Sequence, residues 1–228
     1  MKRLFTFMIM IAVVQTNVFG QSVAEPRRWH FGAMLGPQFS WLVPKVSYGD
    51  QTGGIMAALD VSYAFQNSAK GWSLHLQPGI NRFKSRQVYG KEGTDYYMKW
   101  NWKSMNINLP LLVRYTILEG KIRPFAEIGA SYWVRNYWKV KGTGQTCLNG
   151  QCSPNDFDDK GNSEAEKGKF SGLGGVGVEF DLGKVTVPVT VRWIEQLKKV
   201  ERFREPTIGL DYTIPRSRGL MVSVGVTF

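Results

Sequence analysis

The sequence has no hydrophobic run that could cross a membrane as a helix. Its longest largely apolar stretch, Leu4 to Val14, has eleven residues, whereas a transmembrane helix needs ~20. Two histidines and two cysteines among 228 residues are too few to suggest a metal centre. Acidic residues are also scarce, with 18 Asp and Glu against 29 Lys and Arg. These shortages exclude a helical membrane protein and make a bound metal unexpected.

The first twenty residues differ from the rest of the chain. Lys2 and Arg3 precede the apolar stretch, and small residues stand three and one positions before Gln21. A charged start, a short apolar stretch and a small-residue cleavage site are typical of a secretory signal peptide. We therefore expect residues 1–20 to be removed and residues 21–228 to form one domain. A buried N-terminal helix is the alternative.

The remaining chain is strongly basic. The net charge of +11 includes Lys2 and Arg3, so the chain from Gln21 keeps +9. This balance fits contact with anionic lipid head groups or acidic glycans. We expect no nucleic-acid partner, because an exported chain meets little nucleic acid and the sequence has none of the compact recognition motifs.

Alternating apolar and polar residues are the main pattern after the signal segment. In the last ten residues, Leu220, Val222, Val224, Val226 and Phe228 fall on one face of a strand, because side chains alternate with a period of two. Seven earlier segments alternate similarly, with lengths near the ~9–11 residues of a membrane-crossing strand. We therefore predict an all-β fold, an eight-stranded antiparallel transmembrane β-barrel. The eight segments are Trp29–Trp41, Gly54–Phe65, Trp72–Asn81, Ser104–Ile117, Phe125–Arg135, Gly175–Leu182, Val185–Trp193 and Gly219–Phe228.

The connections alternate between short turns and long loops. Outer-membrane barrels keep short turns on the periplasmic side and long loops outside, so both ends of the barrel domain should be periplasmic. Phe228 resembles the terminal signature that outer-membrane assembly machinery reads, which predicts an integral outer-membrane protein. The predicted external loops are Leu42–Gly53, Phe83–Lys103, Gly142–Lys169 and Ile194–Arg218.

A soluble barrel of the lipocalin kind is the competing fold, and it would turn the apolar faces inward. Two observations favour lipid contact. Aromatic residues gather near both ends of the apolar faces, as in the interfacial girdles of membrane barrels. The opposite faces carry acids and bases that can pair across a narrow lumen. The predicted lumen polar cluster consists of Asp60, His75, Arg114, Glu127, Glu179 and Arg192.

Four prolines lie within the predicted strands, at Pro37, Pro78, Pro110 and Pro188. Each removes a backbone donor from a closed sheet that has no edge. We therefore expect bulges or loosened strand pairing at these positions.

Three runs in the middle of the chain carry a family resemblance. They are Leu76–Ile80, Ile107–Tyr115 and Arg123–Gly129, with a proline before a leucine-rich half strand. The chain resembles the PorT-like outer-membrane β-barrel family there, and more loosely from Trp29 to Phe228. The resemblance implies a barrel that assists a secretion system exporting proteins across the outer membrane. It implies no catalytic residue.

The two cysteines enclose four residues, Leu148 to Gln151, with Asn-Gly at the centre. Asn-Gly favours a two-residue hairpin turn, which makes Cys147 and Cys152 a closely opposed pair with a spacing suited to a disulfide. An exported protein meets oxidising conditions. We therefore predict a disulfide between Cys147 and Cys152 at the tip of a loop.

No set of metal ligands stands out. His30 and His75 should lie at the barrel end opposite the cysteines. Asp156–Gly161 resembles a calcium loop only in part, because Lys160 and Lys167 occupy positions that need oxygen ligands. We expect no metal and no cofactor, with a weak surface calcium site as the alternative.

One predicted external loop is both basic and aromatic, a combination suited to acidic sugars, lipid phosphates or a protein partner. Simple contact with the lipopolysaccharide zone is the alternative for this loop. Its candidate ligand residues are Arg82, Lys84, Arg86, Tyr89, Tyr96, Tyr97, Trp100 and Trp102.

Three classes of function remain open at this level. The first is a non-enzymatic structural or accessory barrel with a protein partner in the outer membrane, by family likeness in protein secretion. The second is a surface module that binds acidic glycan or lipopolysaccharide. The third is a lipid-modifying enzyme, the least favoured because Ser73 and His75 lack an evident triad arrangement. Eight strands leave an interior just filled by side chains, so we expect no open pore.

Overall fold

The structure is a computed structural model. It describes residues 28–43, 51–91, 94, 96–148, 151–162, 169–197, 201–205, 210–214 and 216–228. The predicted signal peptide, residues 1–20, lies outside the described residues. In the described ranges, no helix has the length and apolar character needed to cross a membrane.

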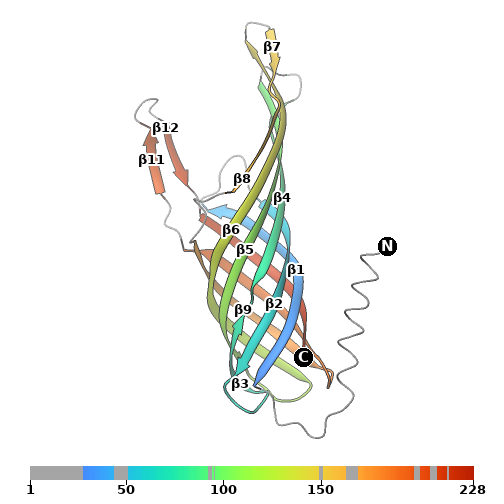
Figure 1. Cartoon of the computed structure of the whole chain (residues 1–228). Coiled ribbons are helices and arrows are strands. Elements are labelled where there is room, and N and C mark those ends of the chain that lie inside the picture. Colours follow the sequence, from blue (N-terminus) through green and yellow to red (C-terminus); the bar gives the residue numbers. More distant parts are fainter. Residues whose placement is uncertain are drawn as a thin grey trace, which may run out of the picture.

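Eight antiparallel staves, each a single strand or two consecutive strands in line, close into a barrel (Figure 1). Gly32 on the first strand lies opposite Thr227 on the last, and the backbone N–H of Phe228 donates to the carbonyl of Phe31 at 2.8 Å. The predicted eight-stranded antiparallel barrel is therefore confirmed. Its staves are β1 (Trp29–Val43), β2 (Gln51–Ala64), β3 (Gly71–Leu76) with β4 (Gly79–Gly90), β5 (Tyr96–Thr116), β6 (Ile122–Leu148), β9 (Phe170–Asp181), β10 (Thr186–Gln196) and β13 (Arg216–Thr227).

The barrel is apolar outside and polar inside. Leu59, Ile128 and Val176 are each at least 60% exposed, as side chains facing lipid should be. Among the described residues, the fully buried side chains include Arg114 and Gln77. This distribution excludes the lipocalin-like alternative, whose apolar faces would point inward.

Aromatic pairs mark the two borders of the apolar surface. At the short-turn end the rings of Trp72 and Tyr115 lie 4.8 Å apart between centroids. At the other end the corresponding distance between Trp41 and Trp193 is 5.3 Å. Amphipathic rings at both ends are typical of the two membrane interfaces.

Three of the four prolines coincide with gaps in strand pairing. Pro78 lies between β3 and β4 and divides the third stave. Pro37 pairs with β2 but falls in a gap of the β1–β13 ladder, and Pro188 pairs with β9 but falls in a gap of the β10–β13 ladder. The predicted loosening is confirmed at these positions. Pro110 stays paired with β6, and its carbonyl accepts from the N–H of Gln77 at 2.9 Å.

Strands β4, β5 and β6 continue beyond the barrel as a tall sheet at the end opposite the C-terminus (Figure 1). Strands β7 (Gln151–Pro154) and β8 (Phe157–Asn162) pair with β6 and complete it. We call this region the external sheet: residues 84–90 of β4, 96–103 of β5 and 139–148 of β6, together with β7 and β8.

Two of the predicted loops are therefore wrong as loops. Most of the described residues of Phe83–Lys103 and Gly142–Lys169 form strands. These strands were not predicted from the sequence because neither of their faces is consistently apolar, so the alternation that identifies membrane strands is absent. The predicted loop Ile194–Arg218 likewise contains a separate hairpin of β11 (Glu201–Glu205) and β12 (Leu210–Ile214).

A bulge in β6 corrects one predicted orientation. The pairing of β5 with β6 shifts between Ile107, opposite Arg135, and Asn108, opposite Trp133. A bulge inserts one residue into one strand and so changes which side the following residues face. Regular alternation along the predicted segment Phe125–Arg135 puts Arg135 on the same side as Glu127, in the lumen. The side chain of Arg135 is instead exposed, and its guanidinium lies 4.7 Å from the ring centroid of Tyr137.

Candidate functional site

Among the described residues, the lumen has a cavity towards each end and is closed in the middle. A cavity of about 250 Å³ at the short-turn end is lined by Asp60, Arg123 and Thr186 among others. One of about 280 Å³ opens towards the external sheet. Between them the space near Met56 and Met221 is only about 20 Å³, which is about one water molecule. The described side chains leave no continuous passage through the barrel.

A buried ion network fills the lumen beside this closure, with Glu127 at its centre. One carboxylate oxygen of Glu127 accepts from Arg192 Nε at 2.7 Å, and the other accepts from Arg114 Nη2 at 2.9 Å. Arg114 Nη1 also donates to Glu179 at 2.7 Å. Charges this deeply buried need partners of opposite sign, and the network supplies them across four strands.

A second arm joins Asp60 and His75 to the same network. Asp60 Oδ1 accepts from Gln77 Nε2 at 2.9 Å, and His75 Nδ1 lies 3.1 Å from both carboxylate oxygens. Arg192 Nη2 donates to Gln77 Oε1 at 3.0 Å. The structure thus brings together all six residues of the predicted lumen polar cluster, and Gln77 links its two halves.

Arg123 is a member that the sequence analysis missed. Its Nη1 donates to Asp181 and its Nη2 to Thr186, both at 3.0 Å. The predicted segment Phe125–Arg135 begins two residues after Arg123, although Arg123, Phe125 and Glu127 share one strand face. Extending the alternation by two residues towards the N-terminus places Arg123 in the lumen.

Ser73, His75 and Asp60 form a hydrogen-bonded chain at the short-turn end. Ser73 Oγ lies 2.9 Å from His75 Nε2, so a hydroxyl, an imidazole and a carboxylate follow one another as in nucleophilic enzymes. Such enzymes also need donors aimed at the developing oxyanion. The nearby Arg114 directs its Nε, Nη1 and Nη2 to Glu127 and Glu179. Arg114 therefore has no free donor for an oxyanion that would form at Ser73.

The external sheet has two different faces. Residues continuing the lipid-facing side of the strands include Lys84, Lys103, Lys139 and Lys160, which lie directly opposite one another on β4, β5, β6 and β8. We call these four residues the lysine row. Arg86, Asn101, Lys141 and Asp158 form the adjacent row on the same face. We call this side the basic face.

The other side of the external sheet is aromatic. The rings of Trp102 and Trp138 stack with centroids 5.6 Å apart, and a Cβ atom added to Gly142 would meet the ring of Phe157. Trp102 also lines the outer cavity of the lumen. We call this side the aromatic face.

The predicted basic and aromatic ligand loop is therefore wrong as a single mixed surface. Arg82, Lys84 and Arg86 lie on the basic side of β4, whereas Trp100 and Trp102 belong to the aromatic face of β5. The strand period of two separates residues that the sequence interleaves. Tyr89 lies on β4, and Tyr96 and Tyr97 lie on β5.

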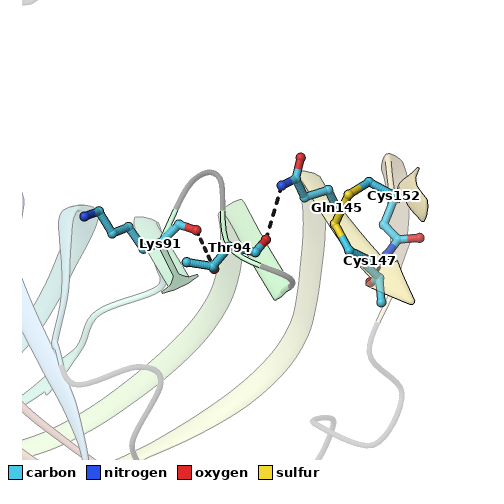
Figure 2. Close-up of a disulfide and its surroundings, with 7 residues drawn as sticks. Lys91, Thr94, Gln145, Cys147 and Cys152 are labelled. Atoms are coloured by element: carbon cyan, nitrogen blue, oxygen red, sulfur yellow. Dashed lines mark hydrogen bonds between the residues drawn. A yellow bond between two sulfur atoms is a disulfide. The ribbon is translucent and has the colours of Figure 1, made fainter. Parts of the chain in front are cut away.

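The predicted cysteine pair lies near the end of the external sheet. Cys147 on β6 and Cys152 on β7 lie opposite one another and are joined by a disulfide (Figure 2). Gln145 Nε2 donates to the carbonyl of Thr94 at 3.2 Å, and Thr94 Oγ1 donates to the carbonyl of Lys91 at 2.7 Å (Figure 2). These bonds tie the β4–β5 connection to β6 just below the disulfide.

Asp158 is an acidic member of the basic face. Its carboxylate lies 2.6 Å from Lys141 Nζ and 3.4 Å from Lys139 Nζ. The hydrogen bond from Lys141 is the main cause that lowers the pKa of Asp158 below its ordinary value. Within the described ranges, no three His, Cys, Asp or Glu side chains come together as a metal site would require.

Several solved outer-membrane proteins follow a similar chain path at low sequence identity. Neisserial surface protein A is 13% identical, with coverage of 88% of this chain and 96% of its own and a TM-score of 0.43. OprG from Pseudomonas aeruginosa is 14% identical, with coverage of 87% and 95% and a TM-score of 0.43. Ail of Yersinia pestis is 11% identical, with coverage of 89% and 100% and a TM-score of 0.36. No curated protein matches the sequence.

A sequence family matches most of the chain. The outer membrane protein beta-barrel domain family aligns with residues 19–193, which include the described lumen network from Asp60 to Arg192 and the external sheet. The apolar outer surface and the polar, ion-paired lumen described above agree with this match. The chain therefore belongs to the outer membrane protein beta-barrel domain family, and its location is the outer membrane.

Proposed function

We propose that the protein is a non-enzymatic, non-transporting barrel that acts through its external sheet. The observation that carries this proposal is a contrast between two ends of the same strands. The middle of the lumen has room for about one water molecule, while β4, β5 and β6 continue beyond the barrel as a two-faced sheet. An eight-stranded barrel filled by side chains cannot conduct solutes. The barrel serves as an anchor, and the external sheet carries the surface for binding.

The proposed orientation follows from the turns. Residues 65–70, 117–121 and 182–185 connect neighbouring staves, and turns as short as these face the periplasm in outer-membrane barrels. The external sheet is at the other end and so faces the outside of the cell. In this proposal residues 1–20 are a signal peptide that is removed during export.

The leading form of the proposal is an accessory subunit with a protein partner in the outer membrane. The aromatic face supports it, because Trp102, Trp138 and Phe157 are the kind of residues enriched at protein interfaces. The resemblance to the PorT-like family adds protein secretion as the process in which this subunit would take part.

Binding of acidic glycan or lipopolysaccharide is the second form of the proposal. The basic face supports it, since the lysine row concentrates positive charge on one side of the sheet. A lipid-modifying enzyme is the least supported function. The Ser73–His75–Asp60 chain lies at the periplasmic end, far from the lipopolysaccharide of the outer leaflet.

Gentle detergent extraction from outer-membrane envelopes, followed by size determination and identification of co-purifying molecules, tests the proposal. The matched variant shortens the external sheet by replacing residues 85–102 and residues 140–159 with Asn-Gly turns. Each replacement joins strand residues that already lie opposite one another, Lys84 with Lys103 and Lys139 with Lys160, and Asn-Gly suits a two-residue hairpin.

The proposal predicts that the full chain is recovered with a stoichiometric partner and that the shortened variant is recovered alone. Resistance of both barrels to unfolding by dodecyl sulfate at room temperature is the control for folding. A folded shortened variant that keeps its partner would overturn the role of the external sheet. A full chain recovered alone would overturn the stable accessory form and leave surface binding.

A further inference from the structure

We propose that the basic face is a binding site for phosphate groups of lipids in the outer leaflet beside the barrel. The inference rests on the proposed orientation, with the external sheet outside, and it names the ligand of one face of that sheet.

The lysine row is a direct alignment of like charges. Lys84 pairs with Lys103, Lys103 with Lys139, and Lys139 with Lys160. Side chains at directly opposed strand positions are ~5 Å apart at Cβ, and like charges there are destabilising. The fold keeps four such residues in line across four strands, which concentrates positive charge suited to an anion.

The described acids neutralise only part of this charge. Asp158 pairs with Lys139 and Lys141. In the part of the chain that the structure describes, no ion pair joins Lys84, Lys103 or Lys160 to an acidic side chain, and all three are exposed. The adjacent row adds Arg86 and Lys141, so the basic face carries a clear excess of positive charge.

The position of the lysine row relative to the membrane points to a lipid ligand. On β5, Lys103 lies on the same strand face as Met105, Ile107 and Leu109 and is nearer than they are to the external end of the strand. These three apolar residues belong to the lipid-facing surface. Lys103 is therefore the first charged residue above the apolar belt on this strand. Lysine side chains extend their apolar stems along such a border and keep the ammonium in the head-group layer.

The surface over the lysine row has room for a head group. A hollow of about 420 Å³ is lined by Lys84, Arg86, Lys103, Lys139 and Lys141 among others. Several ammonium groups and a guanidinium around one hollow match the charge and the acceptor oxygens of a phosphate. A neutral sugar or an apolar chain would offer no negative charge to Lys84 and Lys103, which form no ion pair with a described acid.

The test measures lipid binding by the full-length barrel in detergent micelles with native mass spectrometry. The probe is lipid A with two phosphates, and the comparison probe is the same lipid after enzymatic removal of its phosphates. The test variant carries Lys84→Gln, Lys103→Gln and Lys139→Gln. The matched control carries Lys70→Gln, Lys121→Gln and Lys184→Gln, which remove the same charge at the short-turn end.

The expected result is a loss of affinity for the phosphorylated lipid on the order of a hundredfold in the test variant, if each lysine contributes about fivefold. The control variant should bind the phosphorylated lipid like the wild type. The wild type should bind the dephosphorylated lipid as weakly as the test variant binds the phosphorylated lipid. Equal binding by the test variant and the wild type would overturn the inference. Equal losses in both variants would also overturn it, because the effect would then be one of net charge.

Inorganic phosphate separates a lipid-borne from a soluble source. We expect millimolar phosphate to leave the bound lipid A in place, because the lipid also contacts the apolar belt. Displacement by inorganic phosphate would overturn the lipid source and indicate a soluble phosphate ligand. Failure of the lipid test while the shortened variant still loses its partner would reject this inference alone and leave the proposed function standing.

Discussion

The lumen and the basic face use the same residue types in opposite ways. In the lumen Glu127 lies between Arg114 and Arg192, so buried charges of opposite sign satisfy one another. On the basic face, Lys84 and Lys103 lie side by side with no described acid between them. Paired charges hold a structure together, whereas unpaired like charges on a surface are available to a ligand. The difference suggests that the barrel end of these strands stabilises and the external end binds.

Removing Glu127 should have the largest effect on stability. Glu127→Ala leaves two buried guanidiniums without their shared partner, and breaking such a pair costs about 3–5 kcal/mol. Urea unfolding in lipid vesicles, followed by tryptophan fluorescence, measures the loss. Glu195→Ala is the matched control, because Glu195 also lies between two arginines, Arg216 and Arg218, but is partly exposed. Its expected cost is about 0–1 kcal/mol. Equal costs at the two sites would remove the distinction between paired lumen charges and surface charges.

Overfilling the lumen should have the next largest effect. A Cβ atom at Gly177 would meet the ring of Phe125 inside the barrel, whereas one at Gly174 on the outer side of β9 would meet nothing within 4 Å. Gly177→Leu should destabilise the barrel by about 1–3 kcal/mol. Gly174→Leu should change stability by less than about 0.5 kcal/mol. The same unfolding experiment compares them, and a costly Gly174→Leu would contradict the assignment of that side to lipid.

The acid on the basic face provides a smaller test. The pKa of Asp158 is lowered mainly by its hydrogen bond with Lys141, so any stability that its charge contributes is present above the unfolded-state pKa and is lost as the pH falls through the lower folded-state pKa. Carboxyl NMR of Asp158 should show a pKa below the ordinary value for Asp. Lys141→Gln should raise that pKa, and Lys121→Gln should not. An unchanged pKa in Lys141→Gln would show that Lys141 does not hold this carboxylate.

A chemical probe tests the absence of nucleophilic chemistry in the lumen. The folded barrel should show no labelling of Ser73 by a fluorophosphonate, because the hydrogen-bonding nitrogens of Arg114 are already directed to acids. Mass spectrometry of the treated protein measures the modification. Labelling that disappears in His75→Gln would assign an activated serine to this cavity and would contradict the non-enzymatic proposal.

The barrel was predictable because lipid enforces the alternation that the sequence displays. In strands such as β13, with Leu220, Val222 and Val224 on one face, the sequence pattern predicts which face contacts lipid. The upper parts of β5 and β6 were not predictable in this way, because water on both sides imposes no consistently apolar face on these paired strands. The bulge that turns Arg135 outward also leaves no periodic sign, since it breaks the period itself.

The two faces of the external sheet could also be predicted only in part from the sequence. The sequence indicated that cations and aromatics accumulate between Arg82 and Lys103. Their division into two faces required knowing that the segment is a strand pair and not a loop. The alignment of Lys84 and Lys103 with Lys139 and Lys160 depends on the register of four strands that lie up to 76 residues apart, which one sequence does not reveal.

Surface labelling of the cysteine pair tests most directly that the protein acts outside the cell through its external sheet. Intact cells are treated with a membrane-impermeant phosphine and then with a membrane-impermeant maleimide–biotin, and the protein is recovered and probed for biotin. We predict that Cys147 and Cys152 are labelled in intact cells as fully as in permeabilised cells, while the double variant Cys147→Ser, Cys152→Ser stays unlabelled. Labelling of the natural pair only after permeabilisation would place the external sheet in the periplasm and contradict the account.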